Sequence, residues 1–153
     1  MARDQTELTT RLSTLREFAM VATRRHPAVD ATLLQLIRDH GAGPIQEART
    51  AIFRDLYRRL RVLDKAALDA AAPRRRAIGP WAEFDRLCPR QRAALFLVLT
   101  AGFSIRQVAR ILDLSSAELA SEMGQAIFYL EHVYPFSTPP AEMEIRKRGE
   151  VYA

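Results

Sequence analysis

Almost half of the 153 residues are hydrophobic (48%), which supplies enough apolar surface for a packed core and excludes a globally disordered protein. The longest apolar run, near 93–98, is far too short for a membrane span, and the first ten residues lack the apolar core of a secretory signal, so we expect a cytoplasmic protein. The net charge is +5. Segment 46–76 alone carries nine basic and four acidic residues, so the positive excess of this segment equals that of the whole chain.

Apolar residues recur at three- and four-residue intervals along the chain, a pattern that predicts helices and no strands. In the first half we expect a helix over about 6–25, a second helix capped by Asp30, and a third over about 46–65. The breaker "GAGP" at 41–44 separates the second helix from the third.

The second half predicts four shorter helices. The stretch 81–87 forms a short helix, and the next begins at Pro89 and runs to Thr100. Ser104 caps a third. Ser115 caps the last, where Glu118 completes a capping box.

The fold class predicted is therefore all-α, with two small helical domains joined by a linker. Residues 1–65 form the first domain, and the proline-, glycine- and arginine-rich stretch 66–80 forms the linker. Residues 81–134 form the second domain, and 135–153 form a polar C-terminal tail. The aromatic residues predicted to anchor the core of the second domain are Trp81, Phe84, Phe96, Phe103 and Phe128.

Catalytic and metal-binding patterns are missing from the sequence. His26, His40 and His132 lack metal-ligand spacing, and Cys88 is the single cysteine, which excludes an internal disulfide. No glycine-rich phosphate loop or G-x-S-x-G motif occurs. We therefore expect neither an enzyme nor a cofactor, metal site or small-molecule substrate.

The stretch "LCPRQRAALFLVLTAGFSIRQVARILDLSSAELASEMGQAIFYL", from Leu87 to Leu130, resembles region 4 of sigma-70-family sigma factors, especially the extracytoplasmic-function type. Upstream, "LREFAMVATRRHPAVDATLLQLI" and "AIFRDLYRRLRVLD" resemble the first and last helices of sigma region 2. The resemblance implies a helix-turn-helix in the second domain and a role in bacterial transcription initiation, with RNA polymerase and promoter DNA as partners.

Two stretches depart from that family. The region 2 helix that clamps onto RNA polymerase usually carries a Gln-Glu-rich acidic signature, which "VDATLLQLIRD" lacks. The expected recognition helix, 116–131, contains no Lys or Arg, although a helix that reads DNA needs cations for phosphates and bases. The chain is in this respect similar to PhyR-type anti-anti-sigma regulators, which capture the anti-sigma protein NepR. It is also similar to the sigma-like subunit of gene transfer agent activators. The residues do not separate these two groups, although we expect a free-standing chain to suit the second group better.

One helical face and the linker are candidates for contacts with DNA or polymerase. The spacing of four basic residues predicts that they share one helical face: Arg54, Arg58, Arg61 and Lys65. Besides contacting DNA or polymerase, such a face can be a solvated outer surface or can meet an acidic protein. The triple arginine Arg74, Arg75 and Arg76 can grip phosphates or keep the linker soluble.

The last helix is a candidate docking surface for a protein partner, which would be RNA polymerase, a co-activator or an anti-sigma protein. Three hypotheses compete with this one: a sequestering anti-anti-sigma mimic, an ordinary sigma factor that recognises its promoter, and a dimeric helix-turn-helix repressor. The predicted docking residues are Ser116, Glu118, Ser121, Glu122 and Gln125.

Overall fold

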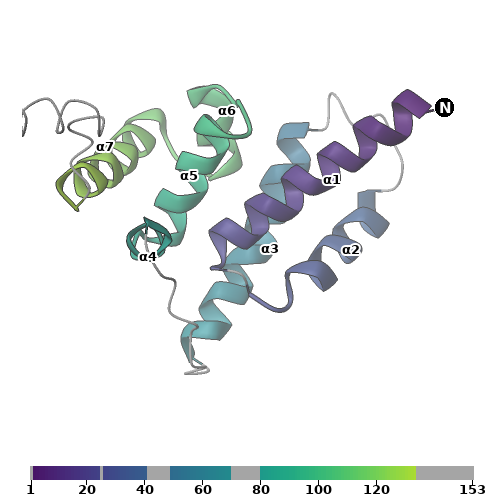
Figure 1. Ribbon diagram of the computed structural model, residues 1–153, viewed down its shortest axis with the longest axis horizontal. Coiled ribbons are helices and arrows are strands. Elements are labelled where there is room, and N and C mark those ends of the chain that lie inside the picture. The colour runs from purple at the N-terminus through teal and green to yellow at the C-terminus, as the bar shows by residue number, and fades with distance from the viewer. Residues whose placement is uncertain (1, 25, 41–48, 70–79, 134–153) are drawn as a thin grey trace, which may run out of the picture.

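A computed structural model describes residues 2–24, 26–40, 49–69 and 80–133, and every regular element within these ranges is a helix. The N-terminal unit contains α1 (Ala2–Ala22), α2 (Val29–His40) and α3 (Arg49–Asp69). The C-terminal unit contains α4 (Pro80–Phe84), α5 (Pro89–Leu99), α6 (Ile105–Ile111) and α7 (Ser116–Val133). Figure 1 shows the two units side by side.

The helix boundaries follow the sequence signals closely. Ser104 caps α6 by accepting a hydrogen bond from the backbone N–H of Gln107, and Pro89 occupies the first turn of α5. The third helix continues four residues beyond its expected end, into the predicted linker, because "AALD" consists mainly of good helix formers. The rest of that linker, 70–79, and the tail from 134 onward lie outside the described residues.

The two units share one hydrophobic core. Helix α1 packs against α5, and α3 packs against α6. The ring of Phe18 lies 5.9 Å from that of Phe96, and the ring of Phe53 lies 5.0 Å from that of Phe103, centre to centre. Each of these pairs joins an aromatic residue of the N-terminal unit to one of the C-terminal unit, so the predicted core anchors Phe96 and Phe103 are buried between the units.

Arg92, the second arginine of "PRQR", is fully buried at this joint. Its Nε donates a hydrogen bond to the carbonyl of Val21 (3.0 Å), and its Nη2 donates one to that of Ala22 (2.7 Å). Its Nη1 donates to the carbonyl of Leu87 in its own unit. The guanidinium thus satisfies carbonyls at the C-terminus of α1, where the helix dipole also favours a cation.

None of the helices in the described ranges combines the length and the apolar character that a bilayer crossing requires.

Replacing Arg92 with methionine should lower the free energy of unfolding by about 2–4 kcal/mol, because several buried carbonyls would lose their hydrogen-bond donor. Arg106→Met, on the exposed surface of α6, is the matched control and should change it by less than about 0.5 kcal/mol. Urea denaturation followed by circular dichroism measures both. Equal effects of the two substitutions would show that Arg92 does not hold the units together.

Candidate functional site: the basic face of α3 and the turn between α6 and α7

The arginines predicted to form a basic face on α3 are exposed where their side chains are described, and part of this face lies beside the turn between α6 and α7. Arg54, Arg58 and Arg61 are all exposed. The first two point to the turn that connects α6 to α7, where both contact Asp113. The remaining residues predicted with them, whose side chains lie outside the described part of the chain, are Lys65, Arg74, Arg75 and Arg76.

Asp113 forms a forked ion pair with two arginines. The Nε and Nη2 atoms of Arg54 lie 2.9 and 2.6 Å from its Oδ1. The Nε of Arg58 lies 2.9 Å from its Oδ2, and the Nη2 of Arg58 lies 3.2 Å from Oδ1. One carboxylate therefore accepts hydrogen bonds from two guanidinium groups one helical turn apart.

The backbone at Asp113 fixes the direction of this carboxylate. Asp113 has a φ of 55°, in the left-handed region, directly after the cap of α6 at Leu112. The N–H of Leu114 donates to the carbonyl of Ala109 (2.9 Å), the hydrogen bond that defines a Schellman ending. Apart from glycine, aspartate is one of the few residues that tolerate this conformation, so Asp113 can occupy a position where glycine is usual.

The arginines also stabilise the charged form of the carboxylate. The hydrogen bond from Arg58 is the largest influence that lowers the pKa of Asp113 below its ordinary value, and the hydrogen bond from Arg54 acts in the same direction. Conversely, the hydrogen bond to Asp113 raises the pKa of Arg58.

Arg49 provides a further link between the units that the sequence did not reveal. Its Nη2 donates a 2.6 Å hydrogen bond to the carbonyl of Ala101, and its guanidinium lies 4.2 Å from the ring centre of Phe103. No local sequence signal separates Arg49 from the other arginines of the same helix.

The predicted docking residues on α7 fall into two groups. Glu118 belongs to a capping box: its N–H donates to Oγ of Ser115 (3.2 Å), and its Oε2 accepts from the N–H of Ser115 (2.8 Å). That backbone hydrogen bond is the largest cause of the lowered pKa of Glu118. Glu122 lies 3.3 Å from Arg90 of α5 and is partly buried. The other predicted docking residues, Ser116, Ser121 and Gln125, are exposed on α7, and the amide of Gln125 donates to the hydroxyl of Ser121 (3.4 Å).

The prediction that Phe128 anchors the core is wrong. Its residue surface is 62% exposed, because Leu119 and Ala126 form the buried face of α7 and Phe128 lies outside that face. Its ring instead lies 3.9 Å from that of His132. Phe84 is partly buried as expected, and the side chain of Trp81 lies outside the described residues.

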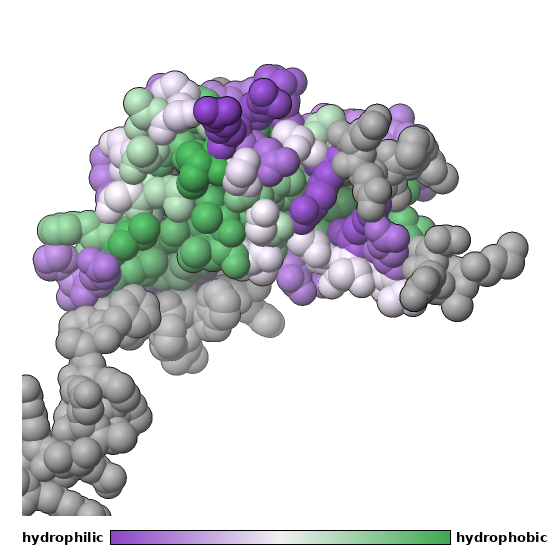
Figure 2. Space-filling model, turned by 90° about the horizontal axis from the view of Figure 1, so that it is seen from above, coloured by the Kyte–Doolittle hydropathy of each residue, from purple (hydrophilic) through white to green (hydrophobic). Residues whose placement is uncertain are grey.

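Large apolar side chains are exposed on the C-terminal unit. Leu99 is 75% exposed, and Ile105, Ile127 and Phe128 are also exposed. Figure 2 shows hydrophobic surface gathered on this half of the molecule when it is viewed from above. Exposed apolar surface of this kind is typical of protein contact regions.

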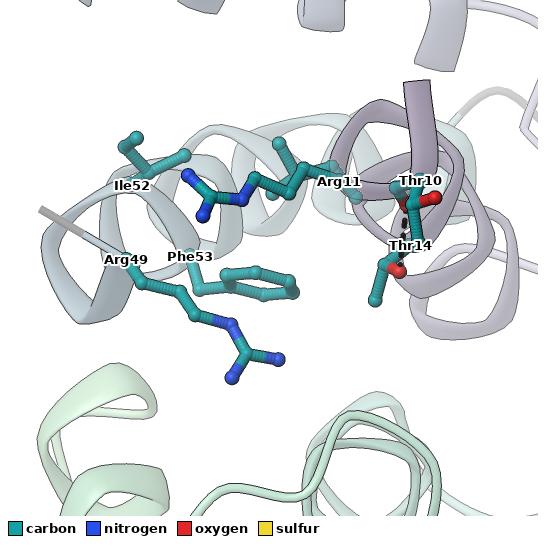
Figure 3. A pocket seen from close by; sticks show the side chains of 7 residues that line it. Thr10, Arg11, Thr14, Arg49, Ile52 and Phe53 are labelled. Atoms are coloured by element: carbon teal, nitrogen blue, oxygen red, sulfur yellow. Dashed lines mark hydrogen bonds between the residues drawn. The ribbon is translucent and has the colours of Figure 1, made fainter. Parts of the chain in front are cut away.

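Metal ions in proteins are held by groups of His, Cys, Asp or Glu side chains. The described residues contain no group of three or more of these residues arranged to hold a metal ion. A pocket of about 280 Å³ lies between α1 and α3 (Figure 3), with Leu15 and Phe53 among its lining. The hydroxyls of Thr10 and Thr14 on its rim donate to carbonyls of their own helix.

Two chains of solved structures share this fold. A chain of the co-crystal structure of the sigma factor RpoE with the anti-sigma factor NepR from Bartonella quintana matches with a TM-score of 0.62 and 20% sequence identity, covering 90% of this chain and all of that one. A chain of the co-crystal structure of the anti-anti-sigma factor PhyR with NepR from Bartonella quintana matches with a TM-score of 0.56 and 22% identity. That match covers 83% of this chain and 50% of the other. No protein-family model and no curated protein matches the sequence.

The fold is that of a sigma-like protein. The expected all-helical architecture, with sigma region 2-like and region 4-like parts, is therefore confirmed. The resemblance to both sigma factors and PhyR-type mimics is confirmed at the level of the fold. The predicted roles of the arginines of α3 and of the exposed residues of α7 remain predictions.

The lowered pKa of Asp113 predicts a specific acid dependence of stability. A depressed carboxyl pKa stabilises the folded state above the unfolded-state value, near 3.8, and this contribution is lost as the pH falls through the folded-state pKa. We therefore expect the difference in unfolding free energy between the natural protein and Asp113→Asn to be constant above about pH 5 and to shrink below about pH 4. Denaturation curves from pH 2.5 to 7 measure it, and a difference independent of pH would contradict the ion pair.

Proposed function

We propose that this protein is a sigma-factor-like regulator of bacterial transcription initiation that acts in the cytoplasm through contacts with other proteins. The observation that carries this proposal is the combination of a sigma-like fold over 90% of the chain with a recognition-type helix, α7, that has no Lys or Arg. A helix without these cations gains little from phosphate contacts or counterion release.

An anti-sigma protein is the first candidate partner. Both similar structures are complexes with the anti-sigma factor NepR, and the C-terminal unit exposes apolar side chains that a protein partner can cover. In this form of the proposal the chain sequesters an anti-sigma protein. RNA polymerase or a co-activator is the alternative protein partner.

A second candidate function is that of an ordinary sigma factor, in which α3 contacts promoter DNA. The exposed row of Arg54, Arg58 and Arg61 favours it. Run-off transcription with purified core RNA polymerase separates the two functions. Specific initiation by this chain and core enzyme alone would support the sigma factor, whereas recovery of a small anti-sigma protein without polymerase in affinity purification would support the sequestering role.

Ser121→Arg tests whether α7 meets protein or DNA. Ser121 is exposed on α7, and a long cation there would obstruct a docked protein but strengthen a contact with phosphates. We expect affinity for the co-purified protein partner to fall by about tenfold or more, with no gain in DNA affinity.

Ser13→Arg, an identical change on the exposed side of α1, is the control and should leave partner binding unchanged. Titration calorimetry with the partner and fluorescence anisotropy with labelled promoter DNA provide the two measurements. Tighter DNA binding by Ser121→Arg with unchanged partner binding would overturn the assignment of α7.

A further inference from the structure

We propose that Arg54 and Arg58 form an anion site for a backbone phosphate of DNA, and that Asp113 occupies this site as an internal competitor. This inference rests on the proposed contact between α3 and DNA and adds to it a way in which the chain itself weakens that contact.

The geometry of the site fits a phosphate. Two guanidinium groups one helical turn apart converge on a single carboxylate, which presents two oxygens to three of their nitrogens at 2.6–2.9 Å. Carboxylate and phosphate groups are bound by arginine through the same planar, forked arrangement of donors. Asp113 therefore holds its oxygens where those of a phosphate would bind.

A polyanion suits this face better than a single carboxylate does. Arg61 follows Arg58 by three residues on the same helix and is also exposed, so the row of positive charge continues beyond the reach of Asp113. A DNA strand carries a phosphate at every nucleotide and releases counterions when such a row binds it. A lone carboxylate from a partner protein would neutralise only part of the row.

The turn itself does not require the negative charge of Asp113. The left-handed conformation at this position, with a φ of 55°, is adopted readily by glycine and also by asparagine. Either residue would complete the ending of α6. What aspartate adds is a carboxylate aimed at α3.

Exchange between Asp113 and a phosphate does not require the units to separate. The side chains of Arg54 and Arg58 are 44% and 54% exposed, so a second anion can approach them while the units stay together. The joint is held by the shared core and by the buried Arg92. An ion pair this exposed is weak, and a multivalent anion can displace it.

The test compares the natural protein with Asp113→Asn, which keeps the turn and removes the charge. The probe is a fluorescein-labelled 30-base-pair DNA duplex in 50 mM salt, read by fluorescence anisotropy. We expect binding to tighten by about three- to tenfold, and the slope of log affinity against log salt to steepen by about one unit.

Asp39→Asn is the matched control. Asp39 forms a 2.7 Å ion pair with Arg59, another arginine of α3 that also pairs with Asp55, so the substitution removes one carboxylate partner of an α3 arginine and raises the net charge by one. A general charge effect would appear equally in both variants. The proposal requires a larger gain for Asp113→Asn, and requires that gain to disappear when Arg54→Gln and Arg58→Gln are added.

A thermal melt shows whether Asp113→Asn remains folded, and Asp113→Gly, which also suits the left-handed turn, replaces it if it does not. Equal affinities of the Asp113 and Asp39 variants, or a gain that survives loss of both arginines, would overturn the proposal. So would the absence of measurable DNA binding by every variant. That last result would leave the protein-contact function intact, because partner recovery in affinity purification does not depend on this site.

Discussion

The positions of all the candidate surfaces depend on the joint at which the C-terminal end of α1 meets α5. A guanidinium from one unit supplies hydrogen bonds to backbone carbonyls of the other, and the rings of Phe18 and Phe96 meet across the same pair of helices. A buried arginine is costly unless its donors are satisfied, so this geometry tolerates little sliding between the helices. With α5 fixed, α6 lies against α3, and the turn after α6 is brought over the basic face. The buried Arg92 and the shared core together thus set the position of a distant ion pair.

The electrostatic character of α7 differs from what its sequence alone indicates. Its carboxylates resembled a negative docking face, but Glu118 completes the first turn of its own helix and Glu122 turns toward Arg90. The exposed surface of α7 carries small and neutral polar side chains beside Glu118 and Glu131, and exposed apolar residues lie on the same unit. The missing cations and the apolar surface therefore support the proposed protein partner more than negative charge does.

The sequence predicted the local features well, because caps and helix periodicity depend on residues a few positions apart. As the sequence predicts, Ser104 and Ser115 cap α6 and α7, and α5 begins at Pro89. The joint was not predictable in this way. Arg90 and Arg92 stand two residues apart in one motif, yet the first is partly exposed and the second fully buried. Only the packing of α5 on α1, between residues about 70 positions apart, distinguishes them.

The shared core has a consequence for how the molecule can be divided. Expressed separately, either half would present to water the rings that now face each other across the joint, such as Phe18 on one fragment and Phe96 on the other. Such fragments would be prone to aggregate or to reassociate when mixed, because the same apolar surfaces would drive both outcomes. Because both units contribute to one buried core, we expect the chain to unfold as a single cooperative unit, although its helices fall into two groups along the sequence.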